Sequence, residues 1–405
     1  MPLRSGAHLW LPFTQMGAFD AQTRTFVRGD GNYLIDARGN RVFDAVSSIW
    51  TTVHGHCHPA ILHAVSRQAA TLDHSTLLGA TNPPAEELAA ELADLLRLDY
   101  TFFASDGASA IEAALKMALQ YWQNAGEPQR TRFVRLTGSY HGDTAGAMSV
   151  SDIELFKSRF GSITFETHAY DCHDEILRSR DVAAIVVEPL VQAASGMRLV
   201  PAEKYSALRD RTPLLIVDEI ATGFGRTGTM FASECLDLAP DIVCVGKGLT
   251  GGTLALSATV VTERVYAAFL GAQSGMRHFF HGHSYAGNPI ACAAALANIA
   301  LFRTEDTLAR AQSCARAVSP LLNELRTHPN VRDVRQCGLM IGVEIAPERI
   351  PPNGFASPAW RIAAGLYDRG HFTRPIGDVV QLVPPLSSTI DELRAFVGDL
   401  YELLA

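Results

Sequence analysis

Two short apolar runs near the middle of the chain constrain its fold more than any other feature of the sequence. Residues 214–217 lead directly to Asp218, and residues 242–245 lead through one glycine to Lys247. Branched runs of this length, bounded by Gly, Pro and Asp, are typical of buried strands in an α/β sheet. Because ligands bind at the carboxyl ends of the strands in such sheets, the pattern predicts a carboxylate and an amine at one sheet edge.

The flanking sequence repeats a rhythm of strand, glycine-rich turn and helix. Further strands are expected at residues 100–104, 132–136, 183–187 and 257–261, and a strong helix at residues 108–123. That helix carries its apolar side chains on one stripe, as a helix that covers a sheet does. The alternation predicts an α/β fold in which a mostly parallel sheet lies between two layers of helices.

Changes in this pattern divide the chain into a large and a small unit. Residues 1–50 combine an irregular start with short extended runs separated by turn residues, which is typical of an antiparallel meander. After residue 304 the sequence indicates an α+β unit of helices, an extended run and a further strand. We therefore predict a large, ligand-binding domain at residues 51–303 and a smaller domain built from residues 1–50 and 304–405.

The composition argues against several classes of protein. The 405 residues are 47% hydrophobic and 19% charged with a formal net charge of -8, which is typical of an ordinary enzyme of more than one domain. The absence of a Lys/Arg run argues against nucleic acid as a partner. No segment reaches the ~18 apolar residues of a membrane span, so no membrane attachment is expected. Seven cysteines without a CxxC pair favour reduced thiols and a cytoplasmic location.

Two motifs invite functional interpretations that their surroundings do not support. GFGRTG at residues 223–228 matches the glycine pattern of dinucleotide-binding loops. Neither a helix-forming segment nor the expected acidic residue about twenty positions later follows it. HGHCHP at residues 54–59 is rich in histidine but lacks a second set of ligands at helical spacing. We therefore expect no metal site and interpret the histidines as part of polar loops.

The segment SDGASAIE at residues 105–112 places small residues between a strand and a helix. The backbone amides of Gly107 and Ala108 would be free at the helix N-terminus, where the helix dipole favours an anion such as phosphate. An ordinary tight turn from strand to helix has the same kind of sequence, so both interpretations stay open at this point.

Lys247 and Asp218 together suggest a particular cofactor. An apolar, glycine-rich surrounding removes water from a lysine, which lowers its pKa and frees the amine for Schiff-base chemistry. Asp218, at the end of a neighbouring strand, is placed to hold a protonated pyridine nitrogen. Pyridoxal 5'-phosphate (PLP) requires this pair, because its pyridinium ring stabilises the carbanion formed when a substrate proton leaves.

Several motifs follow one another in order along nearly the whole chain. They are HLWLPFTQM, SSIWTTVHGHCHP, KMALQYWQ, YHGDT, DEIATGFGRTG, GKGLTGG and TRPIGD. As a set they are far more specific than any single motif. The chain resembles the class III (ω-type) aminotransferases of PLP fold type I, and within them the diaminopelargonate synthases of biotin biosynthesis.

The resemblance implies roles for four residues around the cofactor ring. Lys247 would form the Schiff base and move the proton between substrate and cofactor carbons. Asp218 would pair with the pyridine nitrogen. Tyr140 would stack on one face of the ring, and Ile220 would pack on the other face. Lys247, Asp218 and Tyr140 are therefore the expected catalytic residues.

The resemblance also implies how the phosphate is held. Gly107 and Ala108 would bind it with their backbone amides. Ser284 would reach the phosphate of the neighbouring subunit, which implies a homodimer with shared active sites.

The expected substrate-binding residues come from distant parts of the chain. They are Phe13, Trp50, Tyr140, Asp143, Glu188, Arg374 and Gln381. Arg374 resembles the arginine that grips the carboxylate of 7-keto-8-aminopelargonate in this family. A guanidinium suits that task because it binds a carboxylate through two parallel hydrogen bonds.

The chain departs from many members of the family at two of these positions. Phe13 and Gln381 stand where tyrosines are common, so two hydroxyl groups are missing from the expected pocket. S-adenosylmethionine is the usual amino donor in the family. HLWLPFTQM, HSTLLG and HGHSY resemble the branch that uses L-lysine instead, so the amino donor stays open between the two. An ω-aminotransferase for another diamine or amino acid and a nicotinamide-dependent oxidoreductase are the alternatives.

Overall fold

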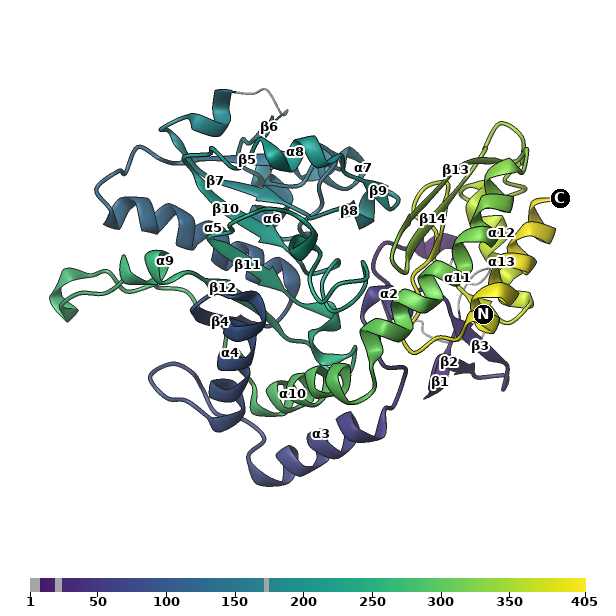
Figure 1. Cartoon of the computed structure of the whole chain (residues 1–405), viewed down its shortest axis with the longest axis horizontal. Coiled ribbons are helices and arrows are strands. Elements are labelled where there is room, and N and C mark those ends of the chain that lie inside the picture. The colour runs from purple at the N-terminus through teal and green to yellow at the C-terminus, as the bar shows by residue number, and fades with distance from the viewer. Residues whose placement is uncertain (1–7, 19–23, 171–174) are drawn as a thin grey trace.

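A seven-stranded sheet forms the centre of the large unit (Figure 1). The computed structural model describes residues 8–18, 24–170 and 175–405. The strands of this sheet are β4 (Tyr100–Ala104), β5 (Arg132–Leu136), β6 (His168–Tyr170), β7 (Val182–Val187), β10 (Leu214–Asp218), β11 (Ile242–Val245) and β12 (Ser257–Val261). Their order is β4-β12-β11-β10-β7-β5-β6, and among the described residues the only antiparallel pairs in it are those made by β12. The prediction of a mostly parallel sheet is confirmed.

Helices cover both faces of this sheet. The α-helices of the large unit are α3 (Pro59–Thr71), α4 (Pro83–Leu96), α5 (Gly107–Asn124), α6 (Ala145–Ser149), α7 (Glu154–Lys157), α8 (Ala202–Ser206), α9 (Glu263–Ala267) and α10 (Pro289–Thr304). Leu214 and Ile216 of β10 are in a buried cluster with residues of α5. Leu215 and Val217 are in another, with residues of α4 and α10. Successive side chains of a strand point to opposite faces, so β10 is apolar throughout because both of its faces are buried.

Two smaller sheets and three α-helices make up the described part of the small unit. The helices are α11 (Thr307–Thr327), α12 (Pro358–Asp368) and α13 (Ile390–Leu404). One sheet contains β13 (Val331–Cys337), β14 (Met340–Ile345) and β16 (Val379–Leu382). The other contains the expected meander of β1 (Phe26–Asp30), β2 (Tyr33–Asp36) and β3 (Arg41–Asp44), followed by β15 (His371–Phe372).

The two ends of the chain meet in the small unit. β15 pairs in parallel with β3, so the N-terminal and C-terminal segments share a sheet. Figure 1 shows the purple N-terminal strands next to the yellow and green C-terminal helices. We propose domain boundaries near residues 50 and 303. The second lies close to the junction at which α10 ends, at Thr304, and α11 begins, at Thr307.

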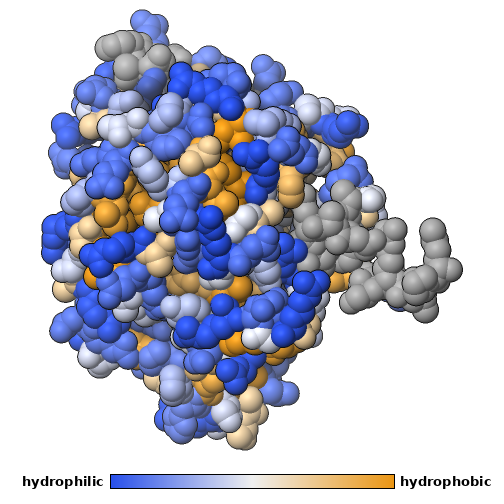
Figure 2. Space-filling view, turned by 90° about the vertical axis from the view of Figure 1, so that its right-hand side faces the viewer, coloured by the Kyte–Doolittle hydropathy of each residue, from blue (hydrophilic) through white to orange (hydrophobic). Residues whose placement is uncertain are grey.

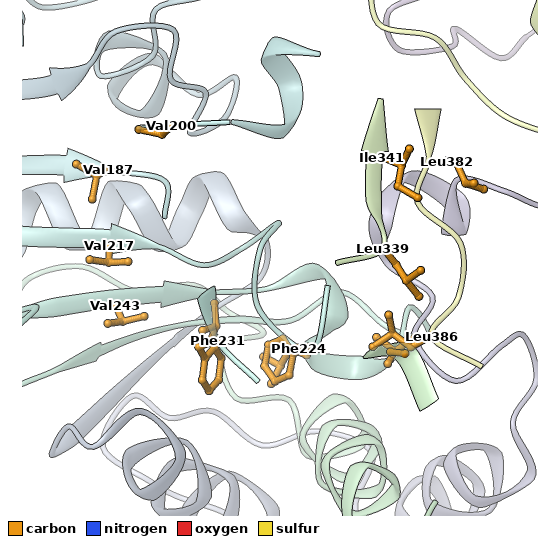
Figure 3. Close-up of a cluster of buried hydrophobic side chains, with 14 of the residues drawn as sticks. Val187, Val200, Val217, Phe224, Phe231, Val243, Leu339, Ile341, Leu382 and Leu386 are labelled. Carbon is orange, nitrogen blue, oxygen red and sulfur yellow. The ribbon is translucent and has the colours of Figure 1, made fainter. Parts of the chain in front are cut away.

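A continuous hydrophobic core joins the large and small units (Figure 3). Phe224 and Phe231 follow β10 in the large unit and stack edge to face, with ring centroids 5.4 Å apart. Leu339, Ile341 and Leu386 bring the small unit into the same buried cluster. The two units are thus held together by packed side chains from both.

The outer face of the small unit is largely hydrophilic. Figure 2 shows this face with hydrophobic side chains in separate patches among charged and polar ones. None of the helices in the described part of the chain is both long enough and apolar enough to cross a membrane.

The histidines of HGHCHP have separate partners. His56 Nε2 lies 2.8 Å from Asp44 Oδ2, and His58 Nε2 lies 3.1 Å from Glu305 Oε1. His54 is buried beneath them against α10 and α11. Across the described residues no group of three or more His, Cys, Asp and Glu side chains could hold a metal ion. The geometry explains these histidines as structural groups.

His54 should make the stability of the protein depend on pH. Its Nε2 lies 3.2 Å from the Asn298 carbonyl oxygen, and burial lowers the pKa of His54 to about 4, against opposing effects of that carbonyl and Glu305. Between pH 4 and 6.5 the unfolded chain binds a proton that the folded chain does not. The free energy of unfolding should therefore fall as the pH falls, by ~2 kcal/mol between pH 7 and 5 from this group.

The His54→Gln variant should lose this part of the pH dependence. Denaturant unfolding at pH 5 and pH 7 measures it, and His63→Gln, on the exposed side of α3, is the matched control. A His54→Gln variant that loses as much stability on acidification as the wild type would contradict the assignment.

Candidate active site

A cavity of about 430 Å³ lies where the strands of the large sheet end. Asp218 is the last residue of β10, Glu188 follows β7, and Lys247 follows β11 by two positions. Nine of the thirteen site residues predicted from the sequence line this cavity: Trp50, Gly107, Ala108, Tyr140, Asp143, Glu188, Asp218, Ile220 and Lys247. The sheet therefore brings together the Asp218 carboxylate at the end of β10 and the Lys247 amine after β11.

Lys247 is a buried amine in a strained piece of backbone. Its φ of 40° lies in the left-handed region, at the start of the 3-10 turn Lys247–Thr250. Burial lowers the pKa of Lys247, and the nearby carboxylates of Asp218, Glu188 and Asp143 oppose this effect. A lysine with a lowered pKa has a larger neutral fraction at neutral pH, and the neutral amine is the nucleophilic and basic form.

Asp218 is held by a histidine that the sequence analysis did not assign. His141 Nδ1 lies 2.7 Å from Asp218 Oδ2, and both side chains are buried. The other carboxylate oxygen of Asp218 accepts a hydrogen bond of 3.0 Å from the Ile220 amide. These contacts fix the carboxylate at the cavity wall, where it can hold a proton on a ring nitrogen. The only sequence signal for His141 was its place in YHGDT, because its partner is 77 residues away.

Tyr140 is fixed at both its backbone and its hydroxyl group. Its amide donates to Glu188 Oε2 at 2.9 Å, and its hydroxyl donates to Asp143 Oδ2 at 2.9 Å. Burial and the Asp143 carboxylate raise the pKa of Tyr140, so the phenol stays neutral. Burial and the negative charge of Asp218 raise the pKa of Glu188 well above its usual value. The Tyr140 ring thus faces the cavity in one fixed orientation.

The N-terminus of α5 forms a close-packed cradle at the cavity. Asp106 caps the helix by accepting a hydrogen bond of 2.9 Å from the Ser109 amide, whereas Gly107 and Ala108 line the cavity. A Cβ atom at Gly107 would lie 2.9 Å from Ile220 Cγ2. The helix dipole and the first amides of α5 favour a bound anion there, and only glycine fits at the first position.

Trp50 enters the cavity from a left-handed turn. Residues 47–50, labelled α2 (Ser47–Trp50) in Figure 1, have φ values of 48°, 49°, 67° and 65°. Each such residue costs about 1–2 kcal/mol relative to right-handed backbone. The Trp50 ring centroid lies 5.3 Å from Lys247 Nζ. Strain of this kind is kept only where the surrounding structure determines the conformation.

Comparison with known proteins identifies the family. Residues 18–404 match the model of the family "Aminotransferase class-III". The chain belongs to the class III aminotransferases. An adenosylmethionine-8-amino-7-oxononanoate aminotransferase from Nitratidesulfovibrio vulgaris is 40% identical, over 96% of this chain and 79% of the relative. One from Aquifex aeolicus is 39% identical, over 97% of this chain and 94% of the relative.

Solved structures of aminotransferases share the fold. The adenosylmethionine-8-amino-7-oxononanoate aminotransferase of Methanocaldococcus jannaschii superposes with a TM-score of 0.92 and 38% identity, covering 98% of this chain and 96% of that one. An amine transaminase from an uncultivated Pseudomonas species, solved with PLP bound, has a TM-score of 0.90 and 32% identity, covering 98% of each chain. The prediction of a PLP-dependent aminotransferase of fold type I is confirmed.

The cavity of this class III aminotransferase fits PLP. The buried amine of Lys247, the carboxylate of Asp218 and the helix N-terminus at Gly107 are the three groups that the aldehyde, the pyridine nitrogen and the phosphate need. His141 Nε2 is buried without a hydrogen-bond partner among the described residues, so His141 contacts Asp218 through its other nitrogen alone. The roles of the individual residues remain predictions.

Four predicted site residues lie away from the cavity wall. Phe13 is 58% exposed and packs edge to face on Phe156. Ser284 is exposed, as a residue that serves another subunit would be in a single chain. Arg374 is partly buried next to the Phe13 ring, at 5.9 Å, and burial lowers its pKa. Gln381 is buried and does not line the cavity, because its amide oxygen accepts a hydrogen bond from Trp50 Nε1.

Proposed function

We propose that the protein aminates 8-amino-7-oxononanoate (7-keto-8-aminopelargonate) to 7,8-diaminononanoate in biotin biosynthesis, with S-adenosylmethionine or L-lysine as amino donor. The observation that carries this proposal is the identity of about 40% over nearly the whole chain to relatives with that activity in their names. The PLP cofactor and the aminotransferase class are those of the family. Arg374, which is partly buried and has no carboxylate partner in the described structure, supports an acidic substrate.

The residues of the cavity divide the chemical tasks among them. Bound PLP supplies a conjugated ring that accepts the charge left on a substrate carbon when its proton leaves. The Lys247 amine is placed to take and return that proton. Asp218, fixed by His141, holds a proton on the ring nitrogen. Gly107 at the N-terminus of α5 orients the phosphate with its backbone amide.

One experiment tests the proposed reaction directly. PLP-loaded protein is incubated with 8-amino-7-oxononanoate and either S-adenosylmethionine or L-lysine, and 7,8-diaminononanoate is measured by mass spectrometry. We expect product with at least one donor, and the donor that gives it settles the choice. If 7,8-diaminononanoate does not form with either donor, the proposal is contradicted.

A different ω-aminotransferase activity is the second candidate. The amine transaminase with 32% identity and a TM-score of 0.90 favours it, since this fold accepts other amines. Turnover of a simple amine with an unrelated ketone, without formation of 7,8-diaminononanoate, would select it. A nicotinamide site at residues 223–228 is not supported, because these residues form a turn and no helix begins there.

Arg374 should determine how tightly the acidic acceptor binds. Removing a hydrogen-bonding group from a charged ligand costs about 1.5–3 kcal/mol, so Arg374→Ala should raise KM for 8-amino-7-oxononanoate about 10–150-fold. The kcat at saturation should change much less, because the guanidinium binds a part of the substrate that does not react. Steady-state kinetics measure both constants.

Two variants sharpen this test of Arg374. Arg374→Lys keeps the charge but loses the planar fork and should recover part of the affinity. Arg394→Ala removes an exposed arginine of α13 that pairs only with Asp391 in the described structure and should leave KM unchanged. An unchanged KM in Arg374→Ala would show that the carboxylate binds elsewhere.

We further propose that the protein is a homodimer with shared active sites. The segment from α9 to α10 projects from the large unit (Figure 1). It exposes Leu270, Met276, Phe280 and Tyr285 and also carries the exposed Ser284. Exposed apolar side chains on a projecting segment are typical of a subunit interface. Sedimentation should give the mass of two 43.8 kDa chains.

The cysteines support a cytoplasmic location for the enzyme. The six cysteines in the described part of the chain are free thiols, and Cys244 and Cys292 are buried as core side chains. Free thiols persist in a reducing compartment, so we place the protein in the cytoplasm as part of the proposal.

A further inference from the structure

Gln381 connects two parts of the site that are far apart in the sequence. It lies in β16 at 1% exposure. Its Oε1 accepts a hydrogen bond of 2.8 Å from Trp50 Nε1, and its Nε2 donates to the backbone carbonyl of Arg374. An indole nitrogen only donates and a carbonyl only accepts, so these partners fix which end of the amide faces which. One side chain thus holds the indole and the backbone that carries the guanidinium.

The backbone around Gln381 reinforces this connection. The Thr373 hydroxyl donates to the Gln381 carbonyl oxygen at 2.6 Å, which fixes the residue just before Arg374. Two positions beyond Gln381, the Val383 carbonyl accepts a hydrogen bond of 2.7 Å from Ser47 Oγ, in the left-handed turn that carries Trp50. The segment 381–383 therefore also fixes Thr373, which precedes Arg374, and Ser47, which begins the turn that carries Trp50.

The left-handed turn has a second support from its N-terminal side. Asp44 accepts hydrogen bonds from the Ser48 amide at 3.0 Å and the Ser48 hydroxyl at 2.8 Å. The turn is thus fixed from β3 and from β16 together, which explains how four residues keep unfavourable dihedral angles. The indole that results is a wall of the cavity beside Lys247.

The two ends of the connection have different tasks. Trp50 borders the Lys247 amine, and Arg374 is the cation proposed to hold the substrate carboxylate. The Arg374 guanidinium has aromatic neighbours, with Phe13 at 5.9 Å and Trp360 at 5.7 Å from the ring centroids. A substrate that reaches both ends must span the distance between them, and that distance depends on how Gln381 holds its two partners.

We propose that Gln381 is a positioning residue that sets the separation between the Trp50 wall and the Arg374 guanidinium, and thereby the chain length of the carboxylate substrate that the site prefers. The identity of the preferred substrate rests on the proposed function. The amide is required because it presents one acceptor and one donor in opposite directions. Glutamate at this position would keep the acceptor for Trp50 but lose the donor, and methionine would leave both partners buried without a hydrogen bond.

The test compares chain-length preference in wild type, Gln381→Met and Gln381→Glu. PLP-loaded proteins are assayed with one amino donor and a series of oxo carboxylates of increasing length. In the variants we expect KM for the acceptor best used by the wild type to rise about tenfold, the loss expected for a buried group left without its partner. The kcat should change less than about threefold, and the optimum of kcat/KM should broaden or move to another length.

Trp50→Phe provides a second variant, because it keeps a ring but removes the donor to Gln381. It should also shift the length preference, and the effects of the two substitutions should be less than additive in the double variant, since both remove the hydrogen bond between Trp50 and Gln381. Should Gln381→Met fail to fold, as judged by its thermal transition and bound PLP, Gln381→Glu and Trp50→Phe decide the question.

An unchanged length profile in folded variants, or an equal loss of kcat/KM for every acceptor, would overturn the proposal. Its failure differs from that of the proposed function. A wild type that does not aminate 8-amino-7-oxononanoate refutes that function, whereas the effect of Gln381 on chain length can still be measured with the other carboxylate acceptors.

Discussion

Lys247→Ala is expected to lower amino transfer by on the order of 10⁴-fold, the upper end of what one acid/base group contributes. The amine is buried, its pKa is lowered by that burial, and it borders the same cavity as Asp218 and Tyr140. No other lysine lines the cavity in the described structure. Steady-state turnover and the visible absorbance of PLP-loaded protein measure the effect, and the band that arises when the lysine holds the cofactor should disappear.

Two controls make the Lys247 prediction specific. Lys247→Arg keeps the positive charge beside Asp218 but has no nucleophilic amine, so it should be as inactive as the alanine variant. Lys204→Ala changes a lysine of α8 that does not line the cavity and should leave turnover and absorbance unchanged. Turnover in Lys247→Ala above a few per cent of wild type would move the reacting amine elsewhere. A wild-type protein without a visible absorbance band after loading with PLP would show that Lys247 does not hold the cofactor.

The central strands could be predicted because their signal is local. β5, β11 and β12 have the predicted bounds, since a run of branched residues between turn residues needs no distant partner to be recognised. β6 was not predicted. It is three residues long, His168–Tyr170, pairs with β5 alone at the edge of the sheet, and has too few residues to show any alternation.

The parts of the site that escaped prediction depend on long-range contacts. Asp218 and Lys247 were found because each follows an apolar run, whereas His141 matters only through a contact with Asp218 that folding creates. Gln381 was expected to face the substrate because of its place in the family pattern. The structure turns its amide to Trp50, 331 residues away in the sequence, and nothing in VVQL indicates that partner.

The role of the GFGRTG motif also depends on long-range contacts that the sequence does not indicate. Its arginine is the residue whose replacement should change the stability most. Its arginine, Arg226, is 1% exposed. Its guanidinium donates to the Pro384 carbonyl at 2.6 Å, to the Thr52 carbonyl at 2.7 Å and to Ser47 Oγ at 3.2 Å. One buried cation thus joins the large unit to the N-terminal and C-terminal segments of the chain. Glycine is needed at position 225 because the turn packs tightly there. Its φ is 85°, and a Cβ at Gly225 would lie 2.5 Å from Leu386 Cδ1.

Arg226→Met is therefore expected to lower the free energy of unfolding by about 3–5 kcal/mol, the cost of breaking a buried charged network by removing one partner. Burial lowers the pKa of Arg226 to about 10, with Asp44 opposing, so the guanidinium stays charged at neutral pH. Its loss removes the donor to the Pro384 and Thr52 carbonyls and a positive charge that interacts with Asp44. Denaturant unfolding of the cofactor-free protein measures the change.

Arg226→Lys and Arg394→Met separate the possible causes. Lysine keeps the charge but cannot present a planar fork to acceptors on two segments, so it should recover only part of the loss. Arg394 is exposed in α13, and its replacement should change stability by no more than about 0.5 kcal/mol. If Arg226→Met were as stable as Arg394→Met, the guanidinium would not hold the segments together. The strained turn that carries Trp50 would then depend on its hydrogen bonds to Asp44 and Val383, because Ser47, which begins that turn, is also the residue of the turn that contacts Arg226.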